Sequence, residues 1–292
     1  LKVDKPAGTT LTLAGNGSVL SVQDSLLLFS AELADGGKTI QLTTSATSNP
    51  SVIYNSGTHT GAGKIEIADN DPTIITGDGN GIFENLDLNN SDASTAPVSL
   101  DAKTTINGDL TFALDNKLFN INDNNLTMGA SATVINADDN NFIQTAGNAG
   151  DEGLTKVYSA SSSTFTFPVG AVSTSRPATP AFTPATIGFS SAPTSYGSVT
   201  VIPVGSEHPV TSSGGNALTY YWRVKSSGVA GFAGNVTHSF SYNASDVAGS
   251  ETNYLPAVYD PSTYAWSRGE RADFDETNDL FADWITPTVS AN

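Results

Sequence analysis

The chain has 292 residues, with 12 Lys and Arg against 29 Asp and Glu, so its formal net charge at pH 7 is −17. So strong an acidic excess, with only four scattered arginines, argues against nucleic acid as a partner. The chain has no cysteine, which excludes disulfides and thiolate sites, and its longest apolar run, 26–29, is far too short for membrane insertion.

Residues 1–150 contain short apolar pairs that recur every 21 to 25 residues. One series is Ile40/Leu42, Ile65/Ile67, Leu86/Leu88, Leu110/Phe112 and Val134/Ile135, and two further series lie between its members. Three short strands per repeat predict a right-handed parallel β-helix of about six coils. An antiparallel sandwich is the alternative for this half, but a sandwich has no reason to repeat one interval for five cycles.

Paired asparagines follow several of these predicted strands, at 89–90, 124–125 and 140–141. Asparagine tolerates left-handed backbone angles, and its amide can stack on the asparagine of a neighbouring coil. We therefore expect these pairs to form the turns of the helix.

Residues 151–292 have a different composition, with 19 of the 25 aromatic residues and all three tryptophans. Their apolar residues alternate with polar ones, as in 163–167, 198–202, 218–224 and 238–242. A period of two predicts strands with one buried face, so this all-β chain is expected to continue as an antiparallel β-sandwich with Trp222 in its core. The domain boundary is expected near the glycine-rich turn at 147–153.

A pattern over roughly residues 70–265, most of the chain, resembles very large surface proteins of Bacteroidetes-type bacteria. The residues that carry it are Asn140-Asn141-Phe142-Ile143-Gln144-Thr145, Gly153-Leu154-Thr155-Lys156, Phe165-Thr166-Phe167-Pro168-Val169-Gly170, Thr183-Pro184-Ala185-Thr186-Ile187, His208-Pro209, Leu218-Thr219-Tyr220-Tyr221-Trp222-Arg223-Val224 and Asp246-Val247. Those proteins look like cargo of the type IX secretion route, including adhesins of gliding motility.

The resemblance implies an extracellular or outer cell-surface location and a role in adhesion, filament building or display. The chain begins at Leu1 without a leader, which predicts a piece of a longer protein whose partners are neighbouring modules or a filament. Its first apolar strands are expected to pair with such a neighbour or to cap the helix; their residues are Leu11, Leu13, Val19, Leu20 and Val22.

The sequence favours a non-catalytic protein. A polysaccharide lyase needs cationic side chains beside its substrate, whereas residues 1–150 contain no arginine. A hydrolase needs two carboxylates across a cleft, for which the candidates are Asp69, Asp71, Asp78, Glu84 and Asp87. Aspartates are also the residues that turns favour, and we expect that structural role for them.

No cofactor is required by the sequence, and calcium is the ion that its oxygen-rich clusters favour. The candidate calcium ligands are Asp69, Asp71, Asp78, Asp273, Asp275 and Asp279. Solvated turns are the alternative interpretation of both clusters.

Aromatic residues crowd a proline-containing stretch near the C-terminus and are candidates for binding a surface polysaccharide. They are Tyr254, Tyr259, Tyr264 and Trp266. Aromatic rings on loops stack well against sugar rings, although the same residues could pack the core instead. The sequence therefore predicts a structural or adhesive module, with a carbohydrate-binding module on a β-helical stalk as the alternative.

Overall fold

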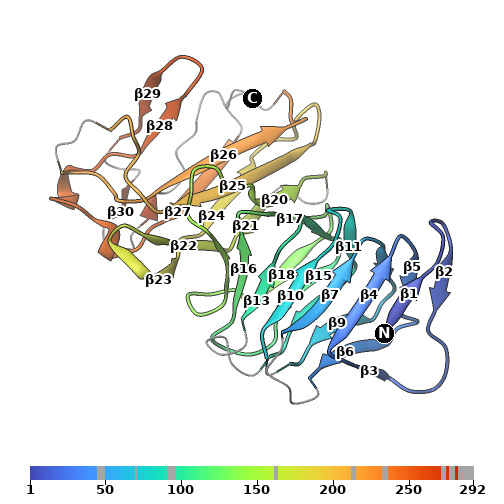
Figure 1. Cartoon of the computed structure of the whole chain (residues 1–292). Coiled ribbons are helices and arrows are strands. Elements are labelled where there is room, and N and C mark those ends of the chain that lie inside the picture. The colour runs from blue at the N-terminus through green and yellow to red at the C-terminus, as the bar shows by residue number, and fades with distance from the viewer. Residues whose placement is uncertain are drawn as a thin grey trace. The chain divides into compact units, whose positions relative to one another are not determined.

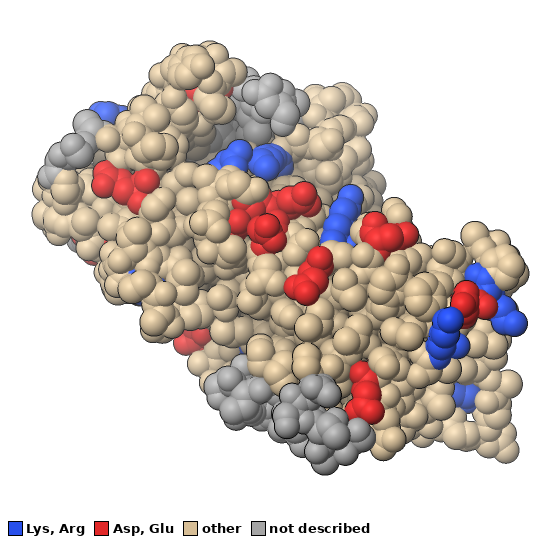
Figure 2. Space-filling model, in the orientation of Figure 1, with Lys and Arg blue, Asp and Glu red and all other residues tan. Residues whose placement is uncertain are grey.

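The computed structural model of the chain is all-β (Figure 1). It describes residues 1–44, 50–69, 71–90, 97–160, 164–211, 215–231 and 236–270, and the backbone of 274–275 and 280–281. None of the helices among these residues is long and apolar enough to cross a membrane. Most of the face in Figure 2 carries no charged side chain, in keeping with a charged fraction of 14%. The chain divides into two compact units, Leu1–Gln144 and Thr145–Asn292.

The first unit is a parallel β-solenoid of about six turns, built from three sheets. The first sheet contains β1 (Lys2–Asp4), β4 (Ser25–Phe29), β7 (Ser51–Asn55), β10 (Thr73–Thr76), β13 (Val98–Leu100) and β16 (Leu118–Asn122). The second contains β2 (Thr10–Thr12), β5 (Glu32–Ala34), β8 (Thr58–Thr60), β11 (Gly81–Phe83), β14 (Thr104–Ile106) and β17 (Asn125–Met128). The third contains β3 (Val19–Gln23), β6 (Thr39–Thr43), β9 (Lys64–Ile67), β12 (Leu86–Leu88), β15 (Asp109–Phe112) and β18 (Thr133–Ile135). The strand β19 (Phe142–Thr145) lies across the boundary of the two units.

The register of the third sheet confirms the predicted repeat. Its strands align one apolar position from each successive coil, namely Ile40, Ile65, Leu86, Leu110 and Val134. The first four of these side chains are at most 1% exposed, so they stack inside the solenoid. Burying an aliphatic side chain of this size contributes about 1.5–3 kcal/mol, and each coil repeats that contribution.

Asparagine side chains join neighbouring coils. Asn85 bridges two of them, since its Nδ2 donates to Gly63 O at 2.7 Å and its Oδ1 accepts from Asp109 N at 2.9 Å. Asn124 donates to Leu100 O at 2.9 Å. These bonds satisfy backbone groups in a turn, at Gly63, and at strand ends, at Leu100 and Asp109.

The left-handed turns fall on residues other than the predicted pairs. None of the asparagines at 89–90, 124–125 and 140–141 has a positive φ. That conformation belongs instead to Asn116, Asn122 and Asn136, with φ of 60°, 52° and 59°. The prediction was wrong because it took adjacent asparagines as the signal, whereas the left-handed conformation occurs at single asparagines at or near the ends of strands.

A polar pair occupies the interior of the solenoid, where other coils place aliphatic side chains. His59 Nε2 and Asp35 Oδ2 lie 3.1 Å apart, both side chains fully buried and without the alignment of a full hydrogen bond. Asp35 Oδ1 accepts from Gly37 N and Gly63 N, and His59 Nδ1 accepts from Glu84 N at 3.3 Å. Burial lowers the pKa of His59 and outweighs the attraction of Asp35, so the imidazole is neutral inside the fold.

The second unit consists of small antiparallel sheets. The strands β20 (Gly153–Val157), β25 (Ser198–Val204) and β26 (Tyr221–Ser227) pair in that order, and β22 (Val169–Ser173) pairs with β23 (Arg176–Phe182). A second group is β21 (Thr164–Phe167), β24 (Ala185–Phe189), β27 (Val236–Ser241), β31 (Leu280–Phe281) and β30 (Phe274–Asp275). The strands β28 (Ala257–Asp260) and β29 (Ala265–Arg268) form a hairpin, and short 3₁₀ helices lie at Ala244–Asp246 and Glu251–Asn253.

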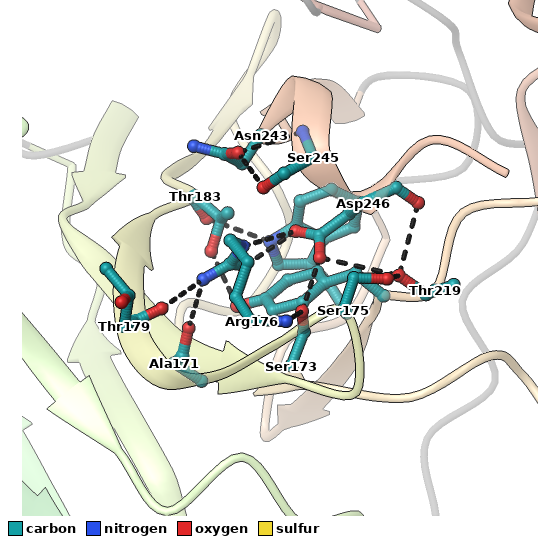
Figure 3. Close-up of polar contacts among 12 residues, drawn as sticks. Ala171, Ser173, Ser175, Arg176, Thr179, Thr183, Thr219, Asn243, Ser245 and Asp246 are labelled. Carbon is teal, nitrogen blue, oxygen red and sulfur yellow. Dashed lines mark hydrogen bonds and ion pairs between the residues drawn. The ribbon is translucent and has the colours of Figure 1, made fainter.

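A buried ion pair organises the polar core of this unit (Figure 3). Arg176 Nη2 donates to Asp246 Oδ2 at 2.6 Å, and its Nη1 donates to the carbonyl oxygens of Ala171 and Thr179. Ser173 Oγ donates to the other oxygen of Asp246, which is fully buried. Buried charges are tolerated only when they are paired and hydrogen-bonded in this way.

We predict that His59 makes the stability of the solenoid depend on pH. Below about pH 6.5 unfolded histidine takes up a proton, while folded His59 does not until a lower pH. The free energy of unfolding should therefore fall as pH falls from about 6.5 towards the folded pKa, by at most about 1.4 kcal/mol per pH unit.

Urea unfolding of the whole chain, followed by circular dichroism at pH 7.5 and 5.5, measures this dependence. His59→Gln should flatten it, and His208→Gln in the other unit should leave most of it in place. Equal slopes for the wild type and His59→Gln would contradict the assignment.

We further predict that Asp246→Asn destabilises the second unit by about 3–5 kcal/mol, because it leaves Arg176 as an unpaired buried charge. Tryptophan fluorescence reports this unit selectively, since all three tryptophans lie in it. Ser227→Ala, at an exposed position of the same unit, should change the stability by less than about 0.5 kcal/mol. Similar unfolding midpoints for the two variants would show that the ion pair is dispensable.

Candidate functional site

Two of the predicted aromatic residues face each other on a hairpin. Tyr259 on β28 lies directly opposite Trp266 on β29, with ring centroids 5.1 Å apart and planes tilted by 53°. Asp260 closes the turn by accepting hydrogen bonds from Ser262 and Thr263. Tyr264 lies in this turn with φ of 54° and is 81% exposed. The hairpin therefore presents an angled pair of half-buried rings and a third, freely exposed ring.

Successive side chains of the strand β26 point to opposite faces of its sheet. Trp222 turns inward, as expected: its Nε1 donates to Thr183 O at 2.9 Å, and its ring lies 5.2 Å from that of Phe240. Tyr221 and Arg223 therefore point from the opposite face of the strand. Burial raises the pKa of Tyr221, and the charge of Arg223 works against that rise.

His208 joins the strand and the hairpin. Its ring centroid lies 4.8 Å from that of Tyr221 and 5.0 Å from those of Tyr259 and Trp266. Its Nδ1 accepts from Val210 N at 3.2 Å, so the neutral ring carries its proton on Nε2. Burial lowers the pKa of His208, which keeps the ring uncharged at neutral pH. The histidine thus acts as a fourth aromatic ring in the cluster.

The aromatic cluster of His208, Tyr221, Tyr259 and Trp266 lines a groove of about 980 Å³ in the second unit. That volume is within the range of small-molecule and saccharide sites. Partly exposed rings at an angle to one another can contact two faces of a bound sugar. The groove is therefore the strongest candidate for a binding site among the described residues.

Tyr254 has a different role from the other predicted aromatic residues. Its ring packs with Tyr242 in a small core, and it is only 6% exposed. Its hydroxyl donates to Ala248 O at 2.7 Å and accepts from Ala248 N at 2.9 Å. Burial raises the pKa of Tyr254, as expected for a hydroxyl held in the core. Tyr254 thus supports the loop before the hairpin; it lies among the residues that line the groove, but little of its ring is exposed.

The structure brings no calcium-binding cluster together in the part of the chain that it describes. Asp69 is fully buried and accepts from Asp71 N at 3.0 Å, while Asp78 accepts from Asn80 N at 3.0 Å. No group of three or more acidic or histidine side chains converges within the described residues. The three candidates near the C-terminus, Asp273, Asp275 and Asp279, have side chains outside the described residues.

Carboxylates on the third sheet of the solenoid hold neighbouring coils together. Lys64 contacts Asp87 closely and Glu66 at 3.3 Å, in a shallow polar hollow of about 380 Å³ lined by Lys64 and Asp87. Burial opposes ionisation of Glu66, but hydrogen bonds from Gln41 and Asn89 lower its pKa below the usual value. A general acid of a hydrolase needs the opposite shift.

Sequence reasoning missed His208 as part of the site. The four rings of the cluster come from three segments, and no local spacing reports that they meet. The sequence did contain a signal for Tyr221. Side chains alternate along β26, so placing Trp222 in the core assigns Tyr221 to the other face of the strand.

Comparisons of the chain with protein-family models, with curated proteins and with solved structures found no match. Since a fold alone does not specify an activity, the residues of the groove are the basis for a functional proposal.

We predict that the pKa of His208, measured by NMR titration of its ring, lies below 6.5 because the surrounding rings exclude water. Trp266→Ala opens the cluster and should move this pKa back towards the ordinary value. Tyr264→Ala, which removes an exposed ring, should leave it unchanged. A pKa that responds equally to both variants would contradict the packing described for His208.

Proposed function

We propose that the chain is a non-catalytic, extracellular adhesive module of a bacterial cell-surface protein, in which the groove of the second unit binds carbohydrate. The finer architecture that we propose is a right-handed β-helical stalk followed by an aromatic-rich β-sandwich. The resemblance to type IX secretion cargo and gliding-motility adhesins supports the cell-surface location and neighbouring modules as partners.

The observation that carries this proposal is the aromatic cluster inside the groove. Tyr259 and Trp266 remain half-buried, so part of each ring is open to a ligand. Sugars have apolar faces, and stacking on an aromatic ring removes those faces from water without a charged partner. Tyr264, beside them in the hairpin turn, offers a further exposed ring.

The solenoid supports the stalk role through its hydrogen bonds. Backbone bonds between consecutive strands run along all three sheets, as between Ile40 and Ile65 in the third. Each coil contacts only its neighbours, so the unit behaves as a stiff rod whose length follows the number of coils.

A scaffold without a ligand is the second candidate. The observation that favours it is the mutual packing of the same rings: His208 already contacts three of them at 4.8–5.0 Å. In that case the cluster would only fix the hairpin against β26.

We predict that the whole chain binds at least one polysaccharide in a glycan array or a pull-down with insoluble polysaccharides, and that Trp266→Ala weakens this binding about 30-fold. That loss corresponds to about 2 kcal/mol, the size expected for a central aromatic contact. The matched control is Tyr54→Ala, which removes a half-buried ring from the solenoid, where it pairs with Phe29 at 4.7 Å.

Both variants are compared at equal folded fraction, with and without millimolar calcium. Binding that survives in Trp266→Ala would place the site elsewhere, and the absence of binding throughout would favour the scaffold.

A further inference from the structure

Three cationic side chains line the same groove as the aromatic cluster. They are Arg223, Lys225 and Arg268. The two-residue period places Arg223 and Lys225 on the face of β26 that also carries Tyr221. By the same period, Arg268 shares a face of β29 with Trp266. Figure 2 shows basic side chains over the strand labelled β26 in Figure 1.

These cations differ from the buried Arg176 in that no carboxylate among the described residues pairs with them. Within the described residues, none of the three takes part in an ion pair. Asp260, a carboxylate that lines the groove, accepts three hydrogen bonds from Ser262 and Thr263 in its own turn. By contrast, Arg176 in the core of the same unit is paired with Asp246 and with two carbonyl oxygens. Arg176 is therefore present to hold the core together, whereas the structure offers no such reason for the cations of the groove.

The concentration of positive charge is unusual for this chain. Only 12 of its 292 residues are Lys or Arg, against 29 Asp and Glu, and three of those 12 meet in one groove. Charge of the opposite sign to the net charge, gathered beside exposed aromatic rings, selects for a ligand that is both anionic and flat-faced.

We propose that the groove binds an acidic polysaccharide, with carboxylate or sulfate groups paired to Arg223, Lys225 and Arg268 and sugar rings held against Tyr259 and Trp266. This inference rests on the carbohydrate-binding function proposed above and names its ligand class. The guanidinium groups suit carboxylates and sulfates, since their planar forks donate two parallel hydrogen bonds. A single-stranded nucleic acid also combines charge with flat rings, and it is one outcome of the test below.

The experiment compares polysaccharides that differ only in charge. Polygalacturonate and alginate are titrated calorimetrically into the whole chain, in EDTA, beside their esterified and therefore uncharged forms. The acidic forms should bind at least about tenfold more tightly than the esters, the size expected when a charge-assisted hydrogen bond is lost. Raising the salt from 50 to 500 mM should remove most of that difference, because the screening length shortens.

The variants Arg223→Gln and Arg268→Gln should each weaken binding of the acidic forms about fivefold or more, and should weaken binding of the esters by a smaller factor. Lys5→Gln, an exposed cation of the solenoid, is the charge-matched control and should have no effect. All three residues are partly or fully exposed, so the variants are expected to fold, which near-ultraviolet circular dichroism checks.

Equal binding of acidic and esterified forms, lost in Trp266→Ala, would overturn the acidic ligand and leave the carbohydrate-binding function standing. No binding of either form would overturn the acidic ligand, and the glycan array then decides separately whether the carbohydrate-binding function stands. Competition by an oligo-dT strand at the same concentration as the polysaccharide would overturn the carbohydrate assignment in favour of a nucleic acid.

Discussion

The constraint on which the first unit depends is that every strand must find its hydrogen-bond partners in the next coil. A strand of three to five residues has no partner within its own coil, so its backbone groups are satisfied only when neighbouring coils stack in register. The interval of 21 to 25 residues between apolar pairs follows directly, because any other interval would place Ile65 away from Leu86. Polar residues inside the stack must then satisfy themselves from the same coils. The Oδ1 atom of Asp35 accepts from Gly37 N and Gly63 N, and the space that this carboxylate fills explains Gly61: a Cβ there would lie 2.2 Å from the carboxylate.

In the second unit, strands with alternating polar and apolar residues bury aromatic side chains. Antiparallel strands with a period of two send Trp222 into the core and Tyr221 to the groove from adjacent positions. Arg176 and Asp246 bring charge into the core only because each is bonded to several neighbours. Residues from both faces of β26 line the groove, Trp222 as well as Tyr221, so a change on either face of the strand is close to the site.

The sequence predicted the solenoid better than it predicted the site, for physical reasons. Stacked coils translate a fixed interval in sequence into contact in space, so Ile40 and Ile65 could be paired from their spacing alone. Left-handed turns depend on where each strand ends, which is why Asn122, and not a pair of adjacent asparagines, adopts the left-handed conformation. His208 meets Tyr259 and Trp266 only through tertiary folding, and no periodicity in the sequence encodes that meeting.

A chain with a net negative charge can bind an anionic polysaccharide only where the attraction inside the groove exceeds the repulsion from the rest of the chain. At physiological ionic strength charges are screened over about 8 Å, so carboxylates on distant coils of the solenoid contribute little at the groove. Within the groove, cations and rings lie inside that distance of a bound sugar, and burial of the rings lowers the local dielectric. The net charge of −17 then keeps the rest of the surface from adsorbing the same polymer, which confines binding to one place. Under this argument the scarcity of Lys and Arg elsewhere is part of the specificity of the groove, since a second basic patch would compete with it.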